Sequence, residues 1–243
     1  MAFGKRKSND DIDEVTEPAQ PPADDGEPDG PFDIEDFDDP AQAALARLDL
    51  GSVLIPMPEA GQVQVELTET GVPSAVWVVT PNGRFTIAAY AAPKSAGLWR
   101  EVASELADSL RKDSAAVNIE DGPWGREVVG RASGVVRFIG VDGYRWMIRC
   151  VVNGAAETID ALTVEARNAL ADTVVRRGDT PLPVRTPLAV QLPEPMAAQL
   201  RAAAEQAAAA AAQQAGERQP PQPVARRSAQ GSAMQQLRSI TGG

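Results

Sequence analysis

The residues whose chemistry could bind a ligand are mainly arginines on two aromatic-containing segments. Arg84 lies in Gly-Arg-Phe-Thr-Ile at 83–87, and Arg145 and Arg149 flank Trp146 in Tyr-Arg-Trp-Met-Ile-Arg at 144–149. Alternate residues of a strand share a face, so Arg145 and Arg149 are expected opposite Trp146. A guanidinium binds carboxylate or phosphate through two parallel hydrogen bonds. These arginines predict a site for an anion or an acidic partner, including this chain's own acidic tail; the alternative is an outward face of salt-bridged arginines.

Two further residues are candidates for chemistry. Trp124 lies in the turn-rich stretch Asp-Gly-Pro-Trp-Gly at 121–125. It either caps the edge of the core or, if exposed, anchors a partner. Cys150 shares the expected face of Trp146 and is predicted to be a buried, unreactive thiol, because Arg149 points to the other face.

The residue inventory argues against most enzyme classes. The chain has no histidine and one cysteine, which excludes Ser-His-Asp and Cys-His catalysis and a zinc site within one chain. There is no phosphate-binding glycine loop and no EF-hand spacing, although carboxylates alone could still hold Mg²⁺ or Ca²⁺. We therefore expect a non-enzymatic protein with no cofactor and no metal.

Charge divides the chain into three parts. Residues 1–40 hold fourteen acids and three bases. Residues 41–193 hold seventeen acids and fifteen bases, and residues 194–243 hold three acids and five bases. The first part is predicted to be a disordered acidic tail. Its hydrophobic residues Phe32, Ile34 and Phe37 either are incidental or form a motif that docks on a basic partner. The near-neutral middle predicts no nucleic-acid binding.

The ends and the cysteine count also bear on location. No run of about 20 apolar residues is present, so no transmembrane segment is expected. Three bases at residues 5–7 are not followed by an apolar stretch, which argues against a signal peptide, and the adjacent acids oppose their attachment to an anionic membrane. A single cysteine fits a reducing compartment, so the expected location is cytoplasmic.

The hydrophobic pattern predicts one α+β domain over residues 41–193. Residues 75–91 and 135–153 read as hairpins with turns at Pro-Asn-Gly and Asp-Gly, and strands are expected at 52–57, 62–67 and 188–192. A helix capped by Ser95 and a second helix over 158–177 should each present an apolar stripe. The stripes are Trp99, Val102, Leu106 and Leu110, and Ile159, Leu162, Ala166, Leu170 and Val174.

The two hairpin–helix halves align at an offset of about sixty residues. This suggests an internal duplication, with convergence of two ordinary hairpins as the alternative. The expected architecture is an antiparallel sheet of two hairpin–helix halves with two packed helices and disordered N- and C-terminal tails. Beyond the domain we expect an exposed Ala/Gln-rich helix at 196–214, a Pro-rich linker at 219–223 and a short C-terminal helix at 232–241.

Several segments resemble a known family. They are Ala-Ala-Pro-Lys-Ser-Ala-Gly-Leu-Trp at 91–99, the stretch at 121–125, the stretch at 144–149, and Val-Val-Arg-Arg-Gly-Asp at 174–179 with Pro181 and Pro183. Over residues 48–193 the chain resembles an actinobacterial family of conserved alanine-, valine- and glycine-rich proteins of unknown function. The resemblance implies an actinobacterial, cytoplasmic protein and brings no activity or catalytic residue with it.

Two functional hypotheses follow from these residues. The first is a binding or adaptor protein that contacts unidentified protein partners through its tails or its sheet face. The second is a small-ligand binder, or an enzyme that works without histidine, with a pocket between sheet and helices. A pocket that brings together Arg145, Arg149 or Tyr90 and a perturbed carboxylate would favour the second. The oligomeric state stays open.

Overall fold

The structure, a computed structural model, describes residues 30–68, 70–113 and 115–217. Its helical elements are η1 (Ile34–Asp36), α1 (Pro40–Ala43), α2 (Leu98–Lys112), α3 (Ile159–Ala171) and α4 (Glu194–Glu217). Its strands are β1 (Phe32–Asp33), β2 (Arg47–Asp49), β3 (Val53–Pro56), β4 (Gln62–Leu67), β5 (Pro73–Thr80), β6 (Gly83–Ala91), β7 (Ala116–Gly122), β8 (Gly125–Arg131), β9 (Val135–Asp142), β10 (Trp146–Gly154) and β11 (Val174–Val175).

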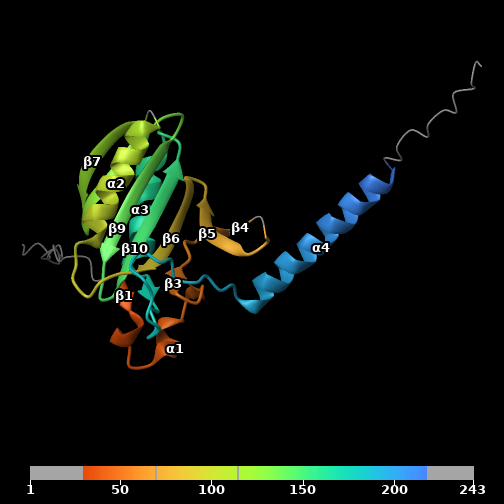
Figure 1. Ribbon diagram of the computed structural model, residues 1–243, viewed down its shortest axis with the longest axis horizontal. Helices are drawn as coiled ribbons and strands as arrows, with labels where there is room; N and C mark the ends of the chain where they lie inside the picture. The colour runs from red at the N-terminus through yellow and green to blue at the C-terminus, as the bar shows by residue number, and fades with distance from the viewer. Residues whose placement is uncertain (1–29, 69, 114, 218–243) are drawn as a thin grey trace, which may run out of the picture.

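A seven-stranded sheet in the order β4-β5-β6-β10-β9-β8-β7 forms the centre of the fold, and its neighbouring strands are antiparallel (Figure 1). The predicted hairpins appear as β5–β6 and β9–β10. Gly83 adopts φ 141°, as expected for the glycine that closes the first turn. The α+β class predicted from the sequence is confirmed.

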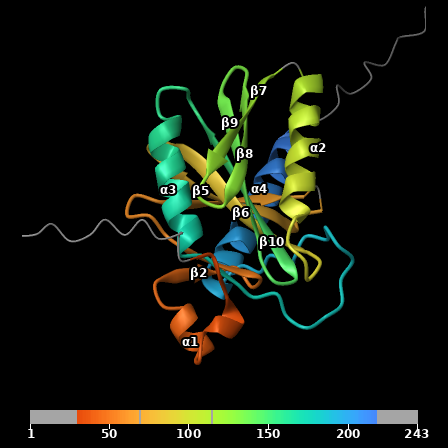
Figure 2. The same ribbon diagram turned by 90° about the vertical axis from the view of Figure 1, so that its left-hand side faces the viewer.

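Helices α2 and α3 cover opposite faces of this sheet (Figure 2). Successive strand residues point to opposite sides, so Met147 packs with Trp99 of α2, whereas Ile148 packs with Leu162 of α3. The predicted stripes do face the sheet, but the two hairpin–helix halves differ in the face that their helix covers. A simple repeat of one unit would place both helices on the same face.

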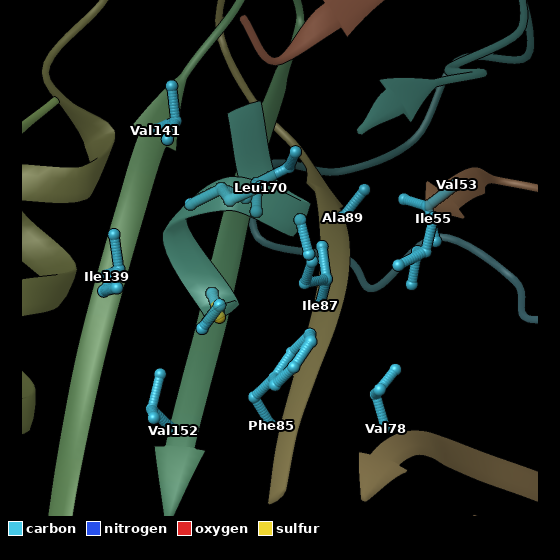
Figure 3. Packing of buried hydrophobic residues seen from close by; sticks show 14 of the residues in the cluster. Val53, Ile55, Val78, Phe85, Ile87, Ala89, Ile139, Val141, Val152 and Leu170 are labelled. Atoms are coloured by element: carbon cyan, nitrogen blue, oxygen red, sulfur yellow. The ribbon is translucent and has the colours of Figure 1, made fainter. Parts of the chain in front are cut away.

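The core under α3 is the larger one (Figure 3). It joins β6, β9 and β10 to α3 and to strand β3 of the small sheet. Phe85, Ile148 and Leu170 are fully buried there, and Cys150 lies among them. Trp146, Ile148, Cys150 and Val152 are all buried in this core, as the alternation in their sequence predicts.

Strands β7 and β8 were not predicted. Their hairpin turns at Pro123-Trp124, inside the stretch that the sequence analysis treats as a loop. Only β8 carries a run of buried residues, since β7 is an edge strand with no residue in the buried class. Edge strands lack the clear alternation that makes an inner strand recognisable.

A second, four-stranded sheet in the order β1-β11-β3-β2 shortens the helix that was predicted over 158–177. Helix α3 ends at Ala171 instead of continuing to residue 177, because Val174 and Val175 pair with β3 as strand β11. Val174 is therefore a strand residue, and Arg177 does not lie at a helix end.

The fold also includes residues 30–40, which the sequence analysis assigned to the acidic tail. Strand β1 pairs with β11, and Phe32, Ile34 and Phe37 pack partly buried against Ala43, Leu54 and Val174. These three side chains thus pack within the domain of this chain, where the docking hypothesis placed them against a partner. Residues 1–29 lie outside the described residues.

Past β11 residues 176–193 form an irregular segment, which we call the strap, rather than the predicted strand at 188–192. Isolated bridges join Pro187 to Tyr90 and Val190 to Gly51. Helix α4 then projects from the domain, and its described side chains are mostly exposed (Figure 1). No helix among the described residues is long and apolar enough to cross a membrane. The predicted linker at 219–223 and helix at 232–241 lie outside the described residues.

Candidate functional site

Helix α2 covers only part of its side of the large sheet. It lies mainly over β7, β8 and β9 and reaches only Met147 of β10 and Tyr90 of β6, so most of β6 and β10 has no helix over it on this side (Figure 1). Strand register places Arg84, Tyr90 and Arg149 on this uncovered part, which we call the open face. The face contains one pocket of chemical interest.

The pocket lies where α2, the open face and the strap meet, and has a volume of about 250 Å³. We call it the Arg149 pocket. Apolar and polar groups line it together: Val102, Leu106 and Met147 with Tyr90, Glu105, Arg149 and Arg185.

Arg149 lacks a charged partner among the described residues. Its guanidinium carbon lies 4.9 Å from the centroid of the Tyr90 ring, a cation–π contact. Its Nε is buried and has no hydrogen-bond acceptor, and none of the salt bridges formed by described residues includes it. A buried donor without an acceptor costs about 1–3 kcal/mol.

Arg185 fixes the strap beside the pocket. Its Nη1 donates to both carboxylate oxygens of Glu105 at 2.9 Å, and its Nη2 donates to Glu101 at 3.2 Å. The hydrogen bond to Glu105 raises the pKa of the Arg185 guanidinium. Arg185 is thereby paired with two acids, Glu101 and Glu105, whereas Arg149 forms no salt bridge with a described residue. Arg185 was not predicted as a site residue; the two acids spaced four apart on α2 were the signal that could have indicated a cation there.

The structure separates the arginines that the sequence grouped. Arg84 stacks on Trp77 at 4.5 Å, outside the pocket. Arg145 precedes β10 in a left-handed conformation with φ 64°. The expected common face of Arg145 and Arg149 does not form, because the strand begins only at Trp146. In that turn Gly143 makes room for the Trp146 ring, which would lie 2.2 Å from a β-carbon at position 143.

Trp124 and Cys150 are both held within the fold. Trp124 packs partly buried on the larger core, and its Nε1 donates to the Gly30 carbonyl, an arrangement that favours the capping interpretation. Burial, with a smaller effect of the Glu127 charge, raises the pKa of the Cys150 thiol. Within residues 30–217, apart from the undescribed positions 69 and 114, no cluster of three Cys, Asp or Glu residues could hold a metal ion.

Fold and pocket together define an α+β domain with a helix on each face of an antiparallel sheet and an arginine that lines a small pocket of mixed apolar and polar groups. The chain belongs to the family described as "Protein of unknown function (DUF3710)", whose model matches residues 30–199. The boundary at residue 30 agrees with the start of the described fold.

One solved structure is similar in part. The solution structure of cyanobacterial PsbP (CyanoP) from Synechocystis sp. PCC 6803 has 10% sequence identity and a TM-score of 0.35. The match covers 54% of this chain and 94% of that one. The comparison with curated proteins gave no match.

Proposed function

We propose that this protein is a non-enzymatic binding protein that holds an acidic segment of a partner protein in the Arg149 pocket. Arg149 carries the proposal, because it is a partly buried cation with an unused Nε and no neutralising carboxylate among the described residues. Carboxylates are the side-chain groups that best satisfy a guanidinium, with which they form charge-assisted hydrogen bonds.

The dimensions of the pocket support a partner's side chain over a free small molecule. Typical small-molecule sites measure roughly 300–1,000 Å³, whereas this one measures about 250 Å³. Val102, Leu106 and Met147 provide an apolar wall that suits one aliphatic side chain, and methionine adapts to differing shapes. We therefore expect recognition of an aliphatic residue with an acidic neighbour.

Calorimetric titration of the full chain with the peptide Asp-Asp-Leu-Asp-Asp tests this proposal. Hydrogen bonds to charged groups contribute about 1.5–3 kcal/mol, so Arg149→Gln should weaken binding by roughly 10- to 100-fold. Arg84→Gln is the matched control, because Arg84 also stacks on an aromatic ring of the open face but lies outside the pocket. Replacing the peptide leucine by serine should weaken binding too. Equal affinities for the two arginine variants would contradict the proposal.

A small organic anion is the second candidate ligand. The presence of both Arg149 and Tyr90 in one pocket favours it, although Arg145 lies elsewhere and Glu105 is engaged by Arg185. Hexanoate offers the same carboxylate and an aliphatic chain without a peptide backbone. Tight binding of hexanoate, lost in Arg149→Gln, with no binding of the peptide would establish this candidate instead.

We also propose an actinobacterial origin and a cytoplasmic location for the protein. The sequence resemblance supports the origin, and the single cysteine supports the location.

A further inference from the structure

A group of cations lies apart from the Arg149 pocket, around the backbone carbonyl of Arg145. The Ala92 N–H and the Arg177 Nε both donate to this carbonyl, at 2.9 and 3.1 Å. Lys94 Nζ lies 5.9 Å from the centroid of the neighbouring Tyr144 ring, and Tyr144 is itself 55% exposed. We call Lys94, Arg145 and Arg177 the basic cluster.

The charge of the basic cluster is not balanced by the described residues. Seven other arginines form salt bridges: Arg47, Arg111, Arg137, Arg167, Arg176, Arg185 and Arg201. By contrast, no described carboxylate forms a salt bridge with the basic cluster, and the hydrogen bonds of the Arg177 side chain go to backbone carbonyls alone. Carbonyls leave the net charge unchanged, so the basic cluster carries three positive charges that form no salt bridge with a described carboxylate.

One residue of the basic cluster, Arg145, has a strained backbone conformation. Arg145 adopts φ 64°, a region that residues other than glycine, asparagine and aspartate seldom occupy. Such strain persists only where the surrounding structure enforces it, and it concentrates at functional sites. The carbonyl of this residue accepts the hydrogen bond from the Arg177 Nε, which links the two arginines.

An acidic segment of the sequence precedes a strand that lies near the basic cluster. Residues 10–29 contain nine acids and no base. They lead directly into β1, where Asp33 pairs with Val175, two residues before Arg177. The Trp146 Nε1 also donates to Asp33 at 2.7 Å, and Arg145 precedes Trp146.

The chain from segment 10–29 to β1 is long enough for the segment to reach the basic cluster. Twenty extended residues span up to roughly 70 Å, and a short tether gives an effective concentration on the order of millimolar. Opposite charges at that concentration need only a weak intrinsic affinity to associate.

We propose that the basic cluster is a binding site for carboxylates and that its occupant is the acidic segment 10–29 of the same chain. This contact goes beyond the proposed function and does not depend on the Arg149 pocket. Because the contact is electrostatic and its cations are at least partly exposed, salt should weaken it within the range where screening is effective.

Zero-length carbodiimide coupling of the full chain tests this proposal, because it joins lysine amines to carboxylates that touch them. The chain has four lysines, Lys5, Lys7, Lys94 and Lys112. We expect Lys94 to couple to acids of segment 10–29 at least several-fold more than Lys112, which is exposed at the end of α2 and serves as the internal control. Mixing isotope-labelled with unlabelled chain distinguishes coupling within one chain from coupling between chains.

Two variants complete the test. Arg145→Asn removes a charge but tolerates a left-handed φ, and it should lower Lys94 coupling several-fold. Arg131→Asn removes an exposed charge at the end of β8 and should leave coupling unchanged. Equal coupling at Lys94 and Lys112, coupling only between chains, or no difference between the two variants would overturn the proposal. None of these results depends on whether the acidic peptide binds at Arg149.

Discussion

Glu127 and Arg137 form a buried ion pair in which the Glu127 Oε2 accepts from the Arg137 Nη1 at 2.6 Å. Their side chains are 1% and 8% exposed. Arg167 of α3 donates to both oxygens of Glu127, and Glu120 of β7 accepts from the second Arg137 nitrogen. Two acids and two bases therefore join β7, β8 and β9 to α3 without a net charge.

Removing the charge of Glu127 should strongly destabilise the protein. Glu127→Gln would leave Arg137 buried without its closest counter-ion, and breaking a buried pair costs about 3–5 kcal/mol. Glu120→Gln should lower the free energy of unfolding by about 1 kcal/mol or less, because the Glu120 side chain is 36% exposed. Urea denaturation measures both. A loss below 1 kcal/mol in Glu127→Gln would show that the network contributes little.

Asp142 should act as the N-terminal cap of α2. Its carboxylate accepts from the backbone N–H groups of Gly97 and Trp99 at 2.8 and 2.9 Å. Loss of a cap costs about 0.5–2 kcal/mol, so Asp142→Ala should lower the free energy of unfolding by that amount. Ser95→Ala is the control, since Ser95 is the cap predicted from the sequence but forms no such bond. A larger loss of stability in Ser95→Ala than in Asp142→Ala would identify Ser95 as the cap instead.

Gly140 is expected to tolerate no side chain. A β-carbon there would lie 1.9 Å from the Trp99 ring, and overpacking costs about 1–3 kcal/mol. Gly140→Ala should therefore lower the melting temperature and alter tryptophan fluorescence as Trp99 shifts. At Gly134 the nearest atom is 3.4 Å away, so Gly134→Ala should behave like the unchanged protein. Similar melting temperatures for both variants would contradict this packing.

Cys150 should not react in the folded protein. Burial raises the pKa of its thiol, and the thiolate is the reactive form. Alkylation with iodoacetamide at pH 8 should therefore be negligible before unfolding and complete in guanidinium chloride, as mass spectrometry can measure. Rapid alkylation of the folded chain would mean that this part of the core opens readily.

Asp49 should make stability depend on pH in the acid range. Burial tends to raise the pKa of this carboxyl, but the Arg176 side chain and the Gly51 N–H together lower it. A lowered pKa means that the stabilisation is complete above the ordinary pKa of aspartate, near 3.9, and is lost as pH falls through the folded value. Asp49→Asn should cost about 1 kcal/mol or less at pH 7, and the difference should shrink near pH 3. A constant difference in urea denaturation at both pH values would exclude this linkage.

Local patterns were sufficient for the inner elements of the fold. Alternation identified β6 and β10 and assigned Ile148 and Cys150 to the core, and helical spacing placed Trp99 and Leu162 toward the sheet. Those residues follow their own element's period, which depends on neighbours in sequence. The edge strand β7 and the short strand β11 carry too few buried residues to show a period, so they were missed.

The residues at the candidate site show where the sequence was insufficient. It determined that arginines would accompany aromatic residues on the β6 and β10 segments, and that histidine chemistry was absent. Only the tertiary structure decided which arginines are neutralised: Arg185 meets Glu105, 80 positions away, while Arg149 meets the ring of Tyr90. Ion pairing depends on which distant carboxylates the folded chain brings within reach, and no local pattern encodes that distance.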